Sequence, residues 1–146
     1  MPEQDGQDSC TVRHLNHVGM AVRDIADTLA LYQELFGVGT SEIEDVPDQG
    51  VKVALVRVGA SQLEFIQPTD SNGSVAHFIE RHGEAVHHIC FEVEDLQDKL
   101  DLLAARGVDL VDATPRQGIS GRIAFLHPRS TRGVLIELVD QDTARR

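Results

Sequence analysis

The sequence predicts an α+β fold made of two copies of one βαβββ unit. An offset of 71 positions, from His17 to His88, aligns an early stretch of the chain with a later one without a gap. The two stretches share a histidine, two aspartates and an apolar stripe, and the matched pairs include His17 with His88, Val22 with Val93, Asp24 with Asp95, and Asp27 with Asp98. Each copy also combines runs of strand periodicity with one helical stripe. A repeat of this kind is stronger evidence for the architecture than any single predicted helix or strand.

Length and composition favour one domain. The chain has 146 residues, of which 41% are hydrophobic, enough for the repeats 12–68 and 85–140 to share a core within a single domain, 12–140. Residues 1–11 are polar and aperiodic and predict a disordered leader, and 141–146 predict a flexible tail. No apolar run is long enough to span a bilayer and no secretory signal is present, so we expect a cytoplasmic protein. The two cysteines, Cys10 and Cys90, do not suggest a disulfide framework.

The charge of the chain is strongly negative but uneven. A formal net charge of −11 argues against binding to nucleic acid or to an anionic membrane. Between Ala113 and Ile136, however, there is no acidic residue, and four arginines occur there: Arg116, Arg122, Arg129 and Arg132. This window predicts either a local anion site or ordinary solvated loop arginines.

The first copy begins with a strand over 12–22. Asp24 is then expected to cap a helix that Gly37 ends, and the apolar stripe of this helix has spacings of three and four residues: Ile25, Leu29, Tyr32 and Phe36. A weaker strand over 38–46 leads to a turn at 47–50. Strands over 51–58 and 62–67 form a hairpin, and Glu64 lies in the second of them.

A short helix within 74–83 joins the copies, and the same pattern then repeats. A strand over 85–93 precedes Asp95, the expected cap of a helix that ends before Gly107 and has the stripe Leu96, Leu100 and Leu103. A short strand near 108–111, a loop over 115–121 and two strands over 122–127 and 134–139 complete the copy. Glu137 lies in the last strand.

Each copy thus has a histidine in its first strand and a glutamate in its last. His17 and Glu64 are 47 residues apart, and His88 and Glu137 are 49 apart. A carboxylate buried among apolar side chains costs several kcal/mol unless it is paired or bound to a metal. If the copies pack about a pseudo-twofold axis, the four side chains form a site suited to a divalent transition metal. A single such residue would more often belong to the core or surface, and His87 is assigned a packing or supporting role.

The chain also resembles a known family over about residues 13–139. The similar segments are Leu15–Val22, Pro47–Val51, Val86–Cys90, Phe125–Ser130 and Gly133–Leu138. They resemble the vicinal-oxygen-chelate (glyoxalase/bleomycin-resistance-like) superfamily and, within it, the methylmalonyl-CoA epimerases. The resemblance implies that the eight strands form a half-open curved barrel around one metal ion.

The resemblance further implies an isomerase that interconverts (R)- and (S)-methylmalonyl-CoA in propionate metabolism, expected as a homodimer. The metal ligands would be His17, Glu64, His88 and Glu137, with Co²⁺ as the first expectation among Mn²⁺, Ni²⁺, Zn²⁺ and Fe²⁺. Glu137 matches the family residue that is both ligand and base. One departure concerns Val53, because some members carry a second catalytic glutamate there. Glu64 is therefore a candidate for the second proton transfer, beside a water or a one-base route.

The acyl-CoA substrate would be held by the arginine-rich hairpin, and the expected contacts are Arg122, Arg129, Ser130 and Arg132. The main rival function is a glyoxalase I acting on a glutathione hemithioacetal, because that enzyme uses two histidines and two glutamates. An extradiol dioxygenase, which needs Fe²⁺, and a metal-free drug-binding protein are less favoured. The fourth ligand, Glu64, argues against the dioxygenase. The matched ligand pairs argue against the drug-binding protein.

Overall fold

The structure is a computed structural model that describes residues 11–39 and 41–141. Residues 1–10 of the expected leader, with Cys10, and residues 142–146 of the expected tail lie outside the described residues. The chain forms two compact units: the N-terminal unit is His17–His88, and the C-terminal unit consists of the described residues before and after it. Strands β1 (His14–Ala21) and β5 (Ala85–Glu92) each contribute to both units. The single-domain organisation stays a prediction.

The N-terminal unit orders its strands β2-β3-β4-β1. Their bounds are β2 Glu44–Val46, β3 Val51–Val58 and β4 Ser61–Pro68, with a 3₁₀ turn, η1, at Pro47–Gln49. β3 and β4 form the predicted hairpin, in which Val58 lies opposite Ser61. β4 runs parallel to β1 with Glu64 opposite Gly19. Because side chains alternate along a strand, His17 and Gly19 share a face of this sheet with Glu64.

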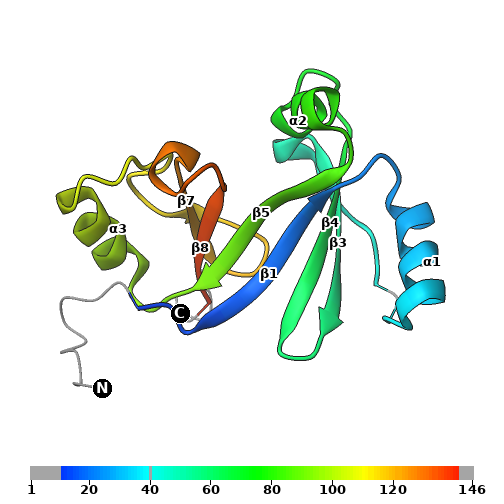
Figure 1. Ribbon diagram of the computed structural model, residues 1–146, viewed down its shortest axis with the longest axis horizontal. Coiled ribbons are helices and arrows are strands. Elements are labelled where there is room, and N and C mark those ends of the chain that lie inside the picture. The colour runs from blue at the N-terminus through cyan, green and yellow to red at the C-terminus, as the bar shows by residue number, and fades with distance from the viewer. Residues whose placement is uncertain (1–10, 40, 142–146) are drawn as a thin grey trace. The chain divides into compact units, whose positions relative to one another are not determined.

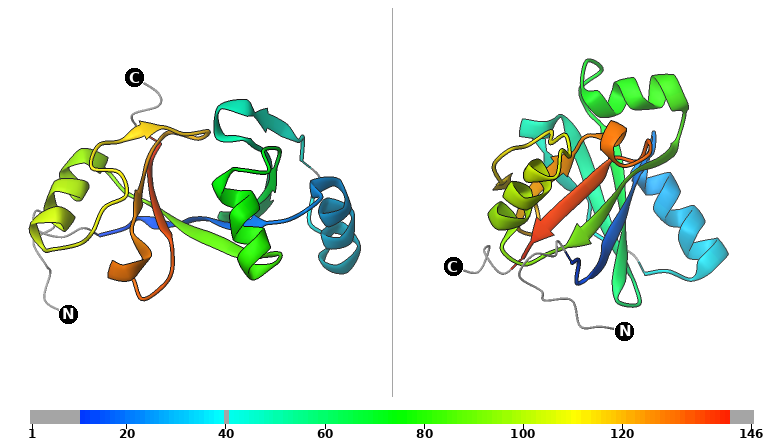
Figure 2. Two further views of the ribbon diagram at one scale, coloured as in Figure 1. Left: turned by 90° about the horizontal axis from the view of Figure 1, so that it is seen from above. Right: turned by 60° about the vertical axis from the view of Figure 1, so that its left-hand side comes forward.

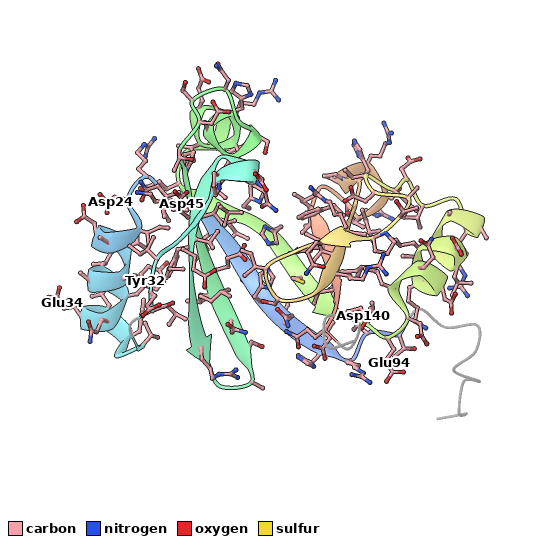
Figure 3. All side chains as sticks on the ribbon, turned by 180° about the vertical axis from the view of Figure 1, so that it is seen from behind. Asp24, Tyr32, Glu34, Asp45, Glu94 and Asp140 are labelled. Carbon is pink, nitrogen blue, oxygen red and sulfur yellow. The ribbon has the colours of Figure 1, made fainter. Side chains whose placement is uncertain are left out.

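Helix α1 (Ile25–Phe36) lies beside β3 and β4 (Figure 1). As predicted, Asp24 caps it, because its Oδ1 accepts a hydrogen bond of 2.9 Å from the Asp27 N–H. Tyr32 points toward the strands while Glu34 points away from them (Figure 3), and the Tyr32 ring packs edge-on against Phe65 at a centroid distance of 5.0 Å. Phe36 is 67% exposed. The predicted apolar stripe is therefore one residue too long, since it ends with Tyr32.

Helix α2 (Ser74–His82) forms where the connecting helix was predicted, and it packs on β4 (Figure 2). Its buried residues Val75 and Ile79 lie in one apolar cluster with Val53 and Ile66. Ile66 is two residues beyond Glu64, so this cluster occupies the same sheet face as Glu64. Val53 is 4% exposed, and it offers only apolar surface at this position.

The C-terminal unit orders its strands β5-β8-β7-β6. It contains α3 Leu96–Ala105, β6 Arg116–Gln117, β7 Arg122–Leu126, the 3₁₀ turn η2 Pro128–Ser130 and β8 Ile136–Asp140. β8 runs parallel to β5 and antiparallel to β7, and α3 packs on β7 and β8 (Figure 1). An apolar cluster joins the helix to these strands: Val93, Leu96, Leu100, Ala124, Leu126 and Leu138.

The two strand orders correspond when β5, β6, β7 and β8 are matched to β1, β2, β3 and β4. Each unit also places one helix between its first two strands in the chain. The repeated βαβββ pattern predicted from the sequence is therefore confirmed in topology. The strand ends differ somewhat: β1 and β2 are shorter than predicted, and β8 begins at Ile136 instead of Val134.

The prediction of a strand at 108–111 was wrong. Val108 and Leu110 pack into the apolar cluster below α3, and Leu110 makes only an isolated bridge to Leu126. The Phe125 N–H donates to Asp112 Oδ2 at 2.9 Å, so a side chain takes the place of a ladder hydrogen bond. The second strand of this repeat is β6, which forms at Arg116–Gln117, within the predicted loop.

The prediction of Asp95 as the cap of α3 was right about its position but wrong about its side chain. Asp95 is left-handed, with φ of 50°, and its side chain makes no capping hydrogen bond. Asp140, at the end of β8, is 2% exposed, and its Oδ2 accepts from the Leu96 N–H at 3.4 Å. A free backbone N–H at the start of α3 thus finds its acceptor in a residue distant in sequence. A local sequence pattern does not reveal such a partner.

Candidate metal centre

Two buried histidines of the N-terminal unit face each other. His17 on β1 is 7% exposed and His88 on β5 is 3% exposed. Their Nε2 atoms are 3.0 Å apart, and their rings meet edge to face with an interplanar angle of 86°. The repeat that pairs these residues in the sequence therefore also brings their imidazole nitrogens together.

Glu64 on β4 completes a group of three donors in this unit. Its Oε1 lies 3.5 Å from His88 Nε2, and its Oε2 lies 3.8 Å from His17 Nε2. The side chain of Glu64 is only 13% exposed. The carboxylate predicted to be costly in an apolar strand is thus placed against the two imidazoles.

Gly19 makes room for this arrangement. A Cβ atom on Gly19 would lie 2.2 Å from Cε1 and 2.5 Å from Nδ1 of His88. No side chain can occupy the position while the His88 ring stays where it is. This role of Gly19 was not predicted, although a glycine inside a strand signals close approach of another group.

The donor set fits a divalent metal ion. Two ligands about 2.1 Å from one ion, with a right angle between them, lie about 3.0 Å apart, and the two Nε2 atoms have this spacing. Imidazole nitrogen and carboxylate oxygen are common ligands of zinc and similar transition metals. His17, His88 and Glu64 can therefore hold such an ion.

Glu137, the fourth predicted ligand, belongs to the C-terminal unit. It lies in β8 opposite Cys90 of β5 and Phe125 of β7. Glu137 is buried, with 6% of its surface exposed. Cys90 is two residues beyond His88 on β5, and alternation places these two side chains on one face of that strand.

His87 contacts its neighbour His88. The two Nδ1 atoms are 2.9 Å apart, and the His87 ring packs edge-on against Phe78 of α2 at a centroid distance of 4.8 Å. The supporting role expected for His87 is consistent with this contact.

The predicted acyl-CoA contacts lie at the surface of the C-terminal unit. Arg122, Arg129, Ser130 and Arg132 are all exposed. Arg129 Nε donates to Asp109 Oδ2 at 2.7 Å, and Ser130 Oγ accepts from the Asp109 N–H at 2.9 Å. Arg122 borders a small pocket whose lining includes Asp95, Asp98 and Asp140. Arg129 and Ser130 thus already have partners within the chain, and a role of the four residues in binding CoA stays a prediction.

Among the residues that the structure describes, no helix is both long enough and apolar enough to cross a membrane.

The chain is similar to known proteins in sequence and in fold. Residues 16–125 match the Glyoxalase/Bleomycin resistance protein/Dioxygenase superfamily. The ethylmalonyl-CoA/methylmalonyl-CoA epimerase of Cereibacter sphaeroides is 33% identical over 87% of this chain and 97% of that protein. The crystal structure of methylmalonyl-CoA epimerase from Mycobacterium tuberculosis has 36% identity and a TM-score of 0.83, and it covers 88% of each chain.

A Streptomyces coelicolor methylmalonyl-CoA epimerase, solved in complex with 2-nitronate-propionyl-CoA, is also similar. It has 33% identity and a TM-score of 0.84 over 89% of this chain and 95% of that chain. The predicted glyoxalase-like α+β fold class is thereby confirmed. The chain belongs to the Glyoxalase/Bleomycin resistance protein/Dioxygenase superfamily, in which its similar relatives include methylmalonyl-CoA epimerases.

Proposed function

We propose that the protein is a metal-dependent methylmalonyl-CoA epimerase. It interconverts the (R) and (S) epimers by removing the proton alpha to the thioester and returning one to the opposite face. The observation that carries this proposal is a group of two buried imidazoles and the carboxylate of Glu64, whose side chain is 13% exposed. The distances between their nitrogen and oxygen atoms are 3.0 to 3.8 Å. This group occurs in a chain about one-third identical to named epimerases over most of its length.

In this proposal the ion is held by His17, Glu64, His88 and Glu137. His17, Glu64 and His88 lie close together in the N-terminal unit. Glu137 is supported as the fourth by its place in the repeat, by its burial and by its register opposite Cys90, on the β5 face that also carries His88. Co²⁺ is the first candidate, with Mn²⁺, Ni²⁺, Zn²⁺ and Fe²⁺ as alternatives, because this ligand set does not select strongly among them.

When bound, a divalent ion supplies positive charge for the oxygen on which negative charge develops as the alpha proton leaves. The residues of the chain handle the proton. Glu137 acts as the base, since a carboxylate held close to the alpha carbon can accept the proton directly. Val53 cannot transfer a proton, so the returned proton comes from Glu64, from a water or, in a one-base route, from Glu137 itself.

The phosphates of the acyl-CoA are assigned to Arg122, Arg129, Ser130 and Arg132. The support is their position in a stretch that lacks acidic residues between Ala113 and Ile136, in a chain whose net charge of −11 would otherwise repel this ligand. The Arg129 pair with Asp109 is exposed on both sides, so exchanging this partner for a phosphate costs little. The homodimer, the cytoplasmic location and a place in propionate metabolism stay predictions.

Glyoxalase I is the rival function, because two histidines and two glutamates are also its ligand set. The test gives the Co²⁺-loaded protein (S)-methylmalonyl-CoA in one reaction and methylglyoxal with glutathione in another. We expect the (R) epimer to appear in the first reaction, measured by chiral chromatography, and no S-lactoylglutathione to form in the second. Turnover of the hemithioacetal alone would replace the epimerase assignment with the glyoxalase one. The metal-stripped protein is the control in both.

A further inference from the structure

His87 approaches the candidate ligand His88 through a ring nitrogen. The two Nδ1 atoms are 2.9 Å apart, within hydrogen-bonding distance. On its other side the half-buried His87 ring packs against Phe78 of α2, with the centroids 4.8 Å apart. The His88 ring is confined in turn by Gly19, at which any Cβ would collide with it. The relative position of the two rings is therefore fixed from several directions.

A hydrogen bond between two Nδ1 atoms requires a proton on one of them and a lone pair on the other. A neutral imidazole carries its proton on only one nitrogen. If Nδ1 of His88 carries the proton, its Nε2 keeps a lone pair, and this atom lies 3.0 Å from Nε2 of His17 and 3.5 Å from Oε1 of Glu64. If Nδ1 of His87 carries it instead, neutral His88 must hold its own proton on Nε2, where the ion would bind.

We propose that His87 is a positioning residue that accepts a hydrogen bond from the Nδ1–H of His88. This bond keeps His88 in the tautomer whose Nε2 lone pair is directed at His17 and Glu64. Partners of this kind orient metal-bound histidines and raise their basicity, and their removal typically lowers metal affinity about 10- to 100-fold. The inference rests on the proposed metal site and is independent of the substrate.

Two substitutions of His87 separate the hydrogen bond from ring packing. His87→Phe keeps an aromatic ring against Phe78 but removes both nitrogens. His87→Asn loses the ring but places an amide oxygen near the position of Nδ1, where it accepts a hydrogen bond. Dissociation constants for Co²⁺ and Zn²⁺ are measured by competition with a chelator in the absence of acyl-CoA. We expect about 10- to 100-fold weaker binding by the Phe variant and recovery of most of that loss in the Asn variant.

The tautomer is read directly by NMR of the metal-free protein with isotope-labelled histidine nitrogens. We expect the His88 proton on Nδ1 in the unchanged protein and in the Asn variant, and a mixture of tautomers in the Phe variant. His82→Phe is the matched control, because the His82 ring packs against the same Phe78, also at 4.8 Å. That variant should change neither the dissociation constants nor the His88 tautomer.

Binding by the Phe variant within twofold of the unchanged protein, with His88 still protonated on Nδ1, would overturn the inference. So would equally weak binding by the Phe and Asn variants, because ring packing against Phe78 would then explain the loss. These measurements contain no substrate. Failure of the epimerase assignment would therefore leave them unchanged, and failure of this inference would leave the epimerase assignment standing.

Discussion

At the scale of single residues, the two glutamates of the proposed site have different tasks. Glu137→Gln removes the base, and we expect epimerase turnover to fall below detection, a loss of roughly 100-fold or more. Glu64→Gln keeps one of the two oxygens that lie 3.5 and 3.8 Å from the imidazoles, so metal binding should weaken while some turnover remains. Metal content and initial rates are measured together, with the exposed Glu34→Gln as control. Equal loss of turnover in both variants would instead indicate a two-glutamate mechanism.

Gly19 provides a steric test of the same centre. In Gly19→Ala the added Cβ would lie 2.2 Å from His88 Cε1, so the imidazole must move. We expect Co²⁺ affinity to fall at least about tenfold, because displacement of one ligand by an ångström disrupts the coordination geometry. Gly39→Ala is the control, since a Cβ there would meet nothing within 4 Å. An unchanged dissociation constant in Gly19→Ala would show that His88 is not a ligand in its present position.

The residue types of the proposed site could be predicted from the sequence, but the close contacts around His88 could not. His17, His88 and Glu64 were predicted from the repeat, since recurrence at one offset separates them from the other histidines and acids. The role of Gly19 was not predicted, because it depends on how closely the His88 ring approaches β1. The His87 contact was not predicted in detail, because it depends on the orientation of two neighbouring rings on β5. That spacing is a property of strand pairing and leaves only a weak trace in the sequence.

At the scale of elements, the start of α3 has two candidate stabilising residues: Asp95, which is next to it in sequence, and Asp140, which is distant in sequence. Asp140→Ala would leave the Leu96 N–H without its acceptor in a buried place, and we expect a loss of about 1 to 3 kcal/mol in the free energy of unfolding. Asp95→Gly should be neutral or slightly stabilising, because glycine adopts the left-handed backbone of Asp95 without strain. Urea unfolding of both variants measures the difference. A larger loss for Asp95→Gly than for Asp140→Ala would contradict the assignment.

The helices and hairpins were predicted well because their signals are local. Asp24, Gly37 and the apolar spacing between them define α1 in the sequence, and the structure places the helix at Ile25–Phe36. The strand at 108–111 failed because apolar alternation also describes a segment that packs on a core without joining a ladder. Its pairing is limited by the Asp112 side chain, which bonds to the Phe125 N–H.

At the scale of the whole molecule, charge opposes the proposed ligand. The chain carries a net charge of −11, so binding of acyl-CoA should depend on the arginines of the acid-free stretch. For Arg129→Ala with Arg132→Ala we expect a higher KM for methylmalonyl-CoA and a weaker dependence of KM on salt than in the unchanged protein. Arg57→Ala, exposed on β3 outside that stretch, is the control. An unchanged KM in the double variant would leave these arginines as solvated surface charges.

The repeat made the architecture of the whole chain predictable from the sequence. Two βαβββ units follow from matched periodicities, and both strand orders agree with that expectation. Placement of Glu137 beside the ion remains a proposal, because the packing of one unit against the other depends on interactions that no local pattern encodes.

The central claim is that a metal ion held by histidines and glutamates promotes exchange of the proton alpha to a CoA thioester. Its most direct test is incubation of methylmalonyl-CoA in heavy water with the metal-stripped protein, the Co²⁺-reloaded protein and reloaded Glu137→Gln, followed by mass spectrometry. We predict that deuterium enters the alpha position only with the reloaded, unchanged protein, because removal and return of this proton constitute the reaction. Equal deuterium uptake with the metal-stripped protein, or none with the reloaded protein, would contradict the account.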